Sequence, residues 1–195
     1  DSEIGDNYYF GTGEKGEFSA FAKATYKVNN QWSVYGDLQG RFINYETDGI
    51  NSDVAEFIVD ESYSFFNPKA GVTYKLNDEN QFYASYARAN REPNRTDFEN
   101  GDPRPERLND FELGWRYNTA KVKLNINGYY MGFRDQLVVS GIDNVGAPIR
   151  TNSGQSYRAG VEIEAAVQLT PKLSVYPNLA LSANKNRDFL FQRDG

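Results

Sequence analysis

The sequence predicts an all-β fold: an antiparallel, up-and-down meander of about eight strands that is part of a transmembrane β-barrel. Two observations carry this prediction. Apolar and polar residues alternate along each expected strand, so they fall on opposite faces of a sheet. The connections between strands are short and long by turns, which gives the sheet two unequal rims, as in outer-membrane barrels.

The first half of the chain supplies two pairs of strands. In the first pair, every second residue of 18–28 and 32–42 is apolar or Gly. A long connection from about residue 46 to 65 follows. The second pair repeats the pattern at 70–76 and 82–86. Because the alternation has a period of two, we expect extended strands with one uncharged face.

The second half supplies two further pairs with the same alternation. The third pair is expected at 111–117 and 122–130, and the fourth at 157–169 and 173–183. Pro177 lies inside the last strand and lacks a donor N–H. We therefore expect a bulge or a sheet edge at this residue.

The two rims of the sheet differ in the length of their connections. Turns of three or four residues join the partners of each pair, at 29–31, 77–80, 118–121 and 170–172. Longer polar connections separate the pairs, at about 46–65, 89–107 and 135–156. Irregular connections of this length are uncommon in compact soluble domains, which favours a barrel with short turns on one side of the membrane.

The face opposite the apolar one carries charges of both signs. They are Lys23, Lys27, Asp37, Arg41, Lys69, Lys75, Asp110, Glu112, Arg116, Lys123, Arg158, Glu162 and Glu164. A closed barrel of only eight strands would have to pair almost all of them in a packed interior. A wide aqueous lumen accepts them, so we expect the apolar face to contact outer-membrane lipid and the charged face to line the lumen.

Alternation is also compatible with a self-contained small β-barrel or β-sandwich binding module. Aromatic residues favour the membrane interpretation because they lie on the apolar face beside the short turns, as an interfacial girdle does. They are Tyr26, Trp32, Tyr74, Phe82, Trp115 and Tyr117. A sandwich would instead bring Val34, Leu113 and Ile163 together in one core.

Composition excludes several classes of function. The chain has no Cys and no His, so it lacks thiolate and imidazole metal ligands, Cys nucleophiles and a Ser-His-Asp relay. Its net charge of -6 argues against nucleic-acid binding, which needs clustered positive charge. We expect no enzyme activity, no metal site and no cofactor. Binding, transport or structural roles remain.

Several stretches resemble the barrel of TonB-dependent outer-membrane receptors of the kind found in Bacteroidetes-like bacteria. The resemblance covers nearly the whole chain, and the stretches lie at 18–26, 32–38, 66–75, 81–93, 105–114 and 152–164. Among them, Pro105-Glu-Arg-Leu-Asn-Asp-Phe-Glu-Leu-Gly114 is similar to the family's stretch that leads into a strand, and Gly160-Val-Glu162 is similar to its Gly-Val-Glu strand.

This resemblance implies that residues 1–195 are part of a receptor barrel of about 22 strands, with the plug and the C-terminal strand absent. The parent would bind and import a small-molecule ligand such as a ferric siderophore across the outer membrane of a Gram-negative bacterium. TonB would act only through the missing plug region. Because an excised sheet has open edges, the isolated segment is expected to self-associate.

Four arginines in the connection at 89–107 are the candidate ligand-binding residues: Arg91, Arg95, Arg104 and Arg107. Guanidinium groups on an extracellular rim could hold an anionic ferric chelate through charge-assisted hydrogen bonds. The same loop contains Asp97, Glu99, Asp102 and Glu106. The alternative is therefore a solvated loop whose charges pair with one another or with lipopolysaccharide.

Overall fold

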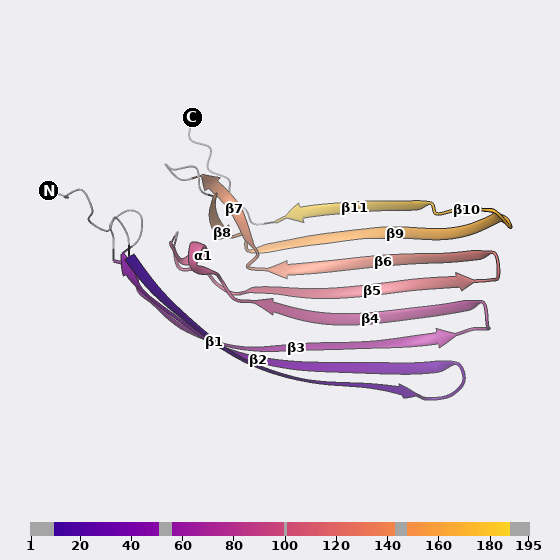
Figure 1. Ribbon diagram of the computed structural model, residues 1–195, viewed down its shortest axis with the longest axis horizontal. Coiled ribbons are helices and arrows are strands. Elements are labelled where there is room, and N and C mark those ends of the chain that lie inside the picture. Colours follow the sequence, from indigo (N-terminus) through magenta and orange to yellow (C-terminus); the bar gives the residue numbers. More distant parts are fainter. Residues whose placement is uncertain (1–9, 51–55, 100, 143–147, 188–195) are drawn as a thin grey trace.

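The computed structural model describes residues 10–50, 56–99, 101–142 and 148–187, and most of them lie in one long antiparallel sheet (Figure 1). Its order is β1-β2-β3-β4-β5-β6-β9, with β10 and β11 both beside β9. The strands are β1 (Phe10–Lys27), β2 (Trp32–Ile50), β3 (Val59–Lys75), β4 (Asn80–Arg91), β5 (Glu106–Asn118), β6 (Val122–Arg134), β7 (Leu137–Ile142), β8 (Pro148–Asn152), β9 (Gln155–Thr170), β10 (Leu173–Val175) and β11 (Asn178–Asn186). The predicted meander is confirmed.

Polar side chains hold the short turns. The Asn29 side-chain oxygen accepts hydrogen bonds from the backbone N–H groups of Gln31 and Trp32, both at 2.8 Å. The Asn77 oxygen does the same for Asn80 at 2.8 Å. Such turns in which an Asn side chain bonds its own downstream backbone are the reason that Asn favours tight connections.

The prediction that the long connections are irregular is wrong in detail, because each of them contains secondary structure. Strands β2 and β3 continue their pairing as far as Thr47 opposite Val59. The second connection holds the short helix α1 (Arg95–Glu99), and the third holds the hairpin of β7 and β8. Beyond the apolar outer face the alternation continues with the two faces exchanged: Ile43 and Tyr63 lie on the inner face, and Asn44 and Ser62 lie on the outer face. A search for apolar residues on the outer face therefore stops before the strands do.

The apolar face of the sheet is not covered. Val34 is 39% exposed and Leu113 is 67% exposed. Among the described residues, the buried hydrophobic side chains are Ile43, Phe57 and Leu137. The sandwich alternative, which required a core around Val34 and Leu113, is therefore wrong.

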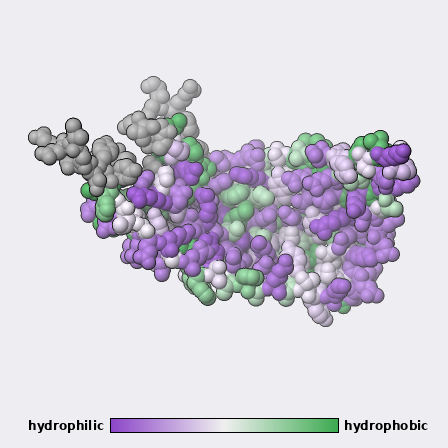
Figure 2. Space-filling model, viewed as in Figure 1, coloured by the Kyte–Doolittle hydropathy of each residue, from purple (hydrophilic) through white to green (hydrophobic). Residues whose placement is uncertain are grey.

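One side of the sheet appears in Figure 2 as a mostly hydrophilic surface, with hydrophobic side chains in a small area near its centre and along its borders. This agrees with the charged face that the alternation predicts.

The sheet is not closed: within the described residues β1 pairs with β2, whereas β10 and β11 pair with β9. The described strands are thus a section of wall, not a small closed barrel.

Aromatic side chains meet on the apolar face beside the short turns, as predicted. The rings of Trp32 and Tyr74 lie 4.5 Å apart between centroids, and those of Phe82 and Trp115 lie 6.4 Å apart. Trp115 also donates its indole N–H to the Asn80 side chain at 3.0 Å. A ring with an apolar body and a polar edge suits a membrane–water interface.

On the charged face, three tyrosines each lie directly opposite a glycine of the neighbouring strand. The pairs are Tyr35 with Gly71, Tyr83 with Gly114, and Tyr129 with Gly160. A Cβ atom on any of these glycines would overlap the tyrosine ring or its hydroxyl. The rings therefore lie over the glycines, which covers the bare backbone, as designed sheets do when an aromatic side chain compensates for Gly.

Pro177 interrupts the last strand between β10 and β11. Its carbonyl accepts a hydrogen bond from the Ala165 N–H at 2.9 Å, but it has no N–H to donate in return. Strands β10 and β11 are the last strands of the described sheet, and Pro177 lies in the break between them. Within the described residues, no helix has the length and apolar character needed to cross a membrane.

Candidate ligand-binding site

A cluster of ion pairs lies on the charged face at the end of the long connections. The ammonium group of Lys15 lies 2.7 Å from a carboxylate oxygen of Glu92, and the Arg41 guanidinium lies 3.2 Å from the same oxygen. Arg41 also contacts Glu17 at 2.9 Å. This cluster ties the segment after β4 to strands β1 and β2, which are far from it in sequence.

Glu92 is the centre of this cluster, and its side chain is 11% exposed. Burial by itself would raise the pKa of this carboxyl. The hydrogen bond from Lys15 and the positive charge of Arg41 outweigh burial, so the pKa of Glu92 lies below its ordinary value of 4.5. Glu92 is therefore ionised at neutral pH and keeps both cations in place.

Helix α1 begins at a reciprocal cap. The backbone N–H of Asp97 donates to the Asn94 side-chain oxygen at 3.1 Å, and the N–H of Asn94 donates to an Asp97 carboxylate oxygen at 2.9 Å. This arrangement satisfies N–H groups that a helix end leaves free. It also fixes the direction of the helix, so that the Phe98 ring stacks on Tyr45 of β2 at 5.9 Å.

A hollow of about 360 Å³ lies between α1 and the wall. It is lined by Lys15, Tyr45, Arg91, Glu92, Pro93, Asn94 and Arg95. Two of the four predicted arginines, Arg91 and Arg95, thus meet in one concave site. The sequence analysis missed Lys15 and Tyr45. Both lie at odd positions of β1 and β2, on the charged face, but nothing in the sequence says which loop folds onto them.

Three of the four predicted arginines pair with carboxylates. Arg91 lies 3.0 Å from Glu106, and Arg95 lies 3.0 Å from Glu99. Arg104 lies 2.7 Å from Asp135. These pairs are partly exposed, and pairs of this kind contribute only about 0–1 kcal/mol. An anionic ligand could therefore exchange with the carboxylates at small cost.

The fourth arginine, Arg107, differs from the others in its position. It lies in β5, an even number of residues before Phe111 and Leu113, so its side chain is on the apolar face of the wall. The structure separates Arg107 from the hollow around Arg91. The ligand-binding role of all four arginines stays a prediction.

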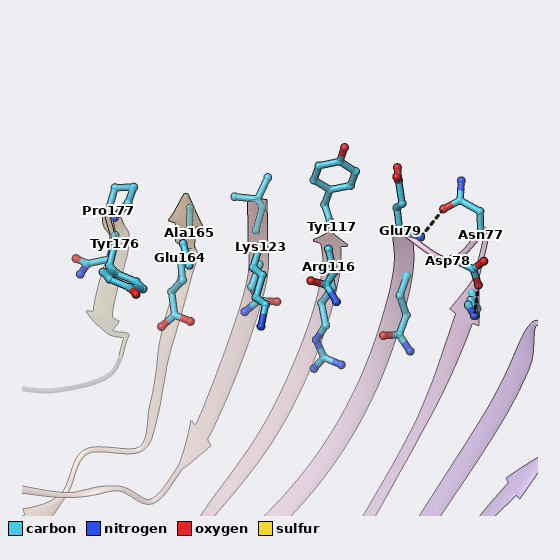
Figure 3. Close-up of a pocket in the computed structure, with 17 residues that line it drawn as sticks. Asn77, Asp78, Glu79, Arg116, Tyr117, Lys123, Glu164, Ala165, Tyr176 and Pro177 are labelled. Atoms are coloured by element: carbon cyan, nitrogen blue, oxygen red, sulfur yellow. Dashed lines mark hydrogen bonds and ion pairs between the residues drawn. The ribbon is translucent and has the colours of Figure 1, made fainter. Parts of the chain in front are cut away.

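A second hollow, of about 730 Å³, lies at the opposite end of the sheet, by the short turns. In Figure 3, Arg116 and Glu164 extend to one side of the sheet and Tyr117 extends to the other. Lys75, at the same rim, lies 2.7 Å from Asp78. This hollow is larger than the one around Arg91, but it is far from the predicted arginines.

Comparison with known proteins identifies this architecture. A family model described as "TonB dependent receptor-like, beta-barrel" matches residues 1–193. The chain belongs to this family. TonB-dependent receptor barrels lie in the outer membrane of Gram-negative bacteria, so the apolar face is the lipid-facing one.

Two curated receptors are similar in sequence. The chain is 28% identical over 181 residues to the "Probable TonB-dependent receptor BfrD" of Bordetella pertussis, which covers 86% of this chain and 24% of that protein. It is 28% identical over 126 residues to the "Ferric-pyoverdine 358 receptor" of Pseudomonas putida, which covers 62% of this chain and 15% of that protein. The chain therefore spans a quarter or less of these relatives. The expected likeness to Bacteroidetes receptors stays a prediction.

A solved transporter structure shows the same fold. The "Copper transporter OprC" superposes with a TM-score of 0.74 at 20% identity, and the match covers 89% of this chain and 29% of that one. At this identity the likeness concerns the fold. A continuous wall of hairpins, polar inside and apolar outside, is the part of a TonB-dependent receptor that this chain supplies.

Proposed function

We propose that this segment is part of the wall of a receptor that binds a small-molecule metal chelate, such as a ferric siderophore, and imports it with energy from TonB. One observation carries the proposal: the hollow around Arg91 and Arg95 opens on the polar inner face of the wall, at the rim with the long connections. That rim faces the exterior in outer-membrane barrels. A ligand from outside would meet this site first.

The residues of the hollow suit an anionic, partly aromatic ligand. Lys15, Arg91 and Arg95 supply cations, and Tyr45 supplies a ring. Guanidinium groups bind carboxylate and hydroxamate-like oxygens through paired N–H donors. Support for a metal cargo comes from two names, a ferric-pyoverdine receptor among the relatives and a copper transporter among the structures.

We infer that the segment binds and does not catalyse. Glu162 and Glu164 lie on the same face of β9, but they are two residues apart on one strand. A pair of catalytic carboxylates acts from opposite sides of a reacting bond. Both side chains lie instead on the wet inner face. TonB would act through the plug, and we propose that the plug and the rest of the barrel lie outside these 195 residues.

An uptake assay on the complete receptor tests the proposal. Iron-starved cells that express the receptor are given radiolabelled ferric pyoverdine, or labelled copper as a second cargo. We expect uptake that stops when TonB is deleted. The double variant R91Q/R95Q should weaken cell-surface binding by about ten-fold, as expected for two charge-assisted contacts.

The matched control removes two cations from the inner face outside the hollow, in the double variant R116Q/R158Q. Its binding should stay within about two-fold of the wild-type value. Uptake that continues without TonB would contradict the transport proposal. Equal binding by both double variants and the wild type would contradict the assignment of the hollow.

A further inference from the structure

A second group of cations lies on the other face of the wall. Every second residue of a strand lies on the same face. Continued from the apolar face toward the rim with the long connections, this alternation leads to Arg88 in β4, Arg107 in β5, Arg134 in β6 and Lys185 in β11. Arg187 follows β11 in the same register, because its N–H donates to the Gln155 carbonyl at 2.8 Å. All five lie on the outer, lipid-facing side.

Strand register places these cations in two adjacent rows. One row runs Arg88, Asn109, Gly132, Tyr157 and Lys185, and the next runs Asn90, Arg107, Arg134, Gln155 and Arg187. None of these ten positions is acidic. The register is continuous through both rows, so no bulge turns an arginine to the inner face.

Among the residues that the structure describes, no carboxylate pairs with these arginines. Every ion pair within the described ranges involves other residues. Arg88 donates to the Asn109 side chain at 3.2 Å, and Arg187 lies over the Tyr157 ring at 5.4 Å. Arg107 and Arg134 face each other directly across the strand pair. Like charges at such positions destabilise a sheet, which is a cost that an anion between them would remove.

The height of the cluster relative to the membrane follows from strand β9. Its outward residues from Ala159 to Leu169 are uncharged, and a transmembrane strand needs about 9–11 residues. The arginine rows lie immediately beyond this stretch, at the end of the long connections. That level corresponds to the headgroups of the outer leaflet.

The surroundings of the cluster combine apolar rings with cations. A hollow of about 710 Å³ is lined by Phe111 and Tyr130 on the membrane side and by Arg88, Arg107, Arg134 and Arg187 on the other. Tyr130 stacks on Tyr157 at 5.8 Å. Gly132 forms part of the floor and leaves room above the backbone. Acyl chains could lie against the rings while a headgroup lies among the guanidinium groups.

We propose that this outer patch, made of Arg88, Arg107, Arg134, Lys185 and Arg187, binds the phosphate groups of an anionic outer-leaflet lipid such as lipopolysaccharide. Arginine binds phosphate through paired N–H donors, and cations near an anionic membrane surface strengthen binding to it. The patch lies on the face opposite the hollow around Arg91, so it is independent of the transport ligand.

Lipid binding by the complete receptor, purified in a neutral detergent, tests this proposal. The receptor is titrated with lipopolysaccharide and with the same lipid after enzymatic removal of its phosphates. We expect the double variant R107Q/R134Q to bind lipopolysaccharide about ten-fold more weakly than the wild type. Removal of the phosphates should weaken wild-type binding to a similar degree. The inner-face variant R116Q/R158Q, with the same change of charge, should match the wild type.

Two further measurements use the unmodified receptor, so they do not depend on the folding of a variant. Binding should weaken when salt is raised from about 0.05 to 0.5 M, because screening shortens the reach of exposed charges. Inorganic phosphate at concentrations that match the lipid should leave binding unchanged. Equal binding of the dephosphorylated lipid, equal loss in both double variants, or saturation by inorganic phosphate alone would each overturn the proposal.

Discussion

Replacement of Gly114 by Ala should destabilise the wall through the tyrosine that covers it. A Cβ atom at this position would overlap the Tyr83 ring, so the ring must move. Tyr83 donates its hydroxyl to the Asn127 side chain at 2.9 Å, and the Arg116 guanidinium lies 4.4 Å from the ring centre. Movement of the ring weakens both contacts at once.

The size of the effect follows from these contacts. Loss of the hydrogen bond costs about 1 kcal/mol, loss of the cation–π contact costs about 0.5–1 kcal/mol, and crowding costs about 1–3 kcal/mol. Ala in place of Gly in a strand returns about 0.5–1 kcal/mol. We expect a net loss of about 1.5–4.5 kcal/mol in the free energy of unfolding.

The assay is urea unfolding of the complete receptor in detergent micelles, followed by tryptophan fluorescence. Gly36→Ala is the matched control, because a Cβ atom there meets nothing within 4 Å, and it should be neutral or slightly stabilising. In the Tyr83→Ala background the Gly114→Ala change should no longer cost stability. An equal cost of Gly114→Ala in both backgrounds would refute the reasoning, because the ring would then not be the cause.

Three further predictions concern the inner site and the sheet edges. The folded pKa of Glu92 lies below 4.5, so its ion pairs should stabilise the fold at neutral pH and lose this effect as the pH falls below 4.5 toward the folded pKa. The difference in melting temperature between wild type and E92Q should therefore shrink in this acidic range. A difference that stays constant with pH would contradict the prediction. Asn94→Ala removes the cap of α1 and should lower the local stability of this helix by about 1 kcal/mol. Hydrogen exchange at the Phe98 amide should then become faster, and unchanged exchange would count against the cap. Strands β1 and β11 are exposed along their whole length. Residues 1–195 alone should therefore form oligomers in detergent-free buffer, and a monomeric sedimentation profile would contradict this prediction.

Short turns and the lipid-facing face could be predicted because each rests on local chemistry. Asn29 bonds its own downstream backbone, and the alternation of residues 159–169 requires no knowledge of neighbouring strands. The extension of β2 and β3 to Thr47 and Val59 could not be predicted in the same way. The period of two persists there but the faces are exchanged, with Ile43 and Tyr63 on the inner face and Asn44 and Ser62 on the outer face. A rule that places apolar residues on the outer face therefore ends both strands too early.

The arginines of the 89–107 connection show the same limit. Arg107 could have been assigned to the outer face by extending the alternation from Phe111 two steps further. Arg91 and Arg95 could be recognised as candidates, but their partner Lys15 could not. The contact between Lys15 and Glu92 joins residues 77 positions apart, and no local pattern encodes which loop folds onto which strand.

The sequence by itself determined the fold class, the two unlike faces and the side on which the long connections lie, because a period of two and the chemistry of tight turns are local properties. Only the tertiary structure decided which cations share a hollow with Tyr45 and which outer-face cations lie beside one another on neighbouring strands, as Arg107 and Arg134 do. Those assignments depend on strand register and on the path of α1, which are set by contacts between residues far apart in the chain.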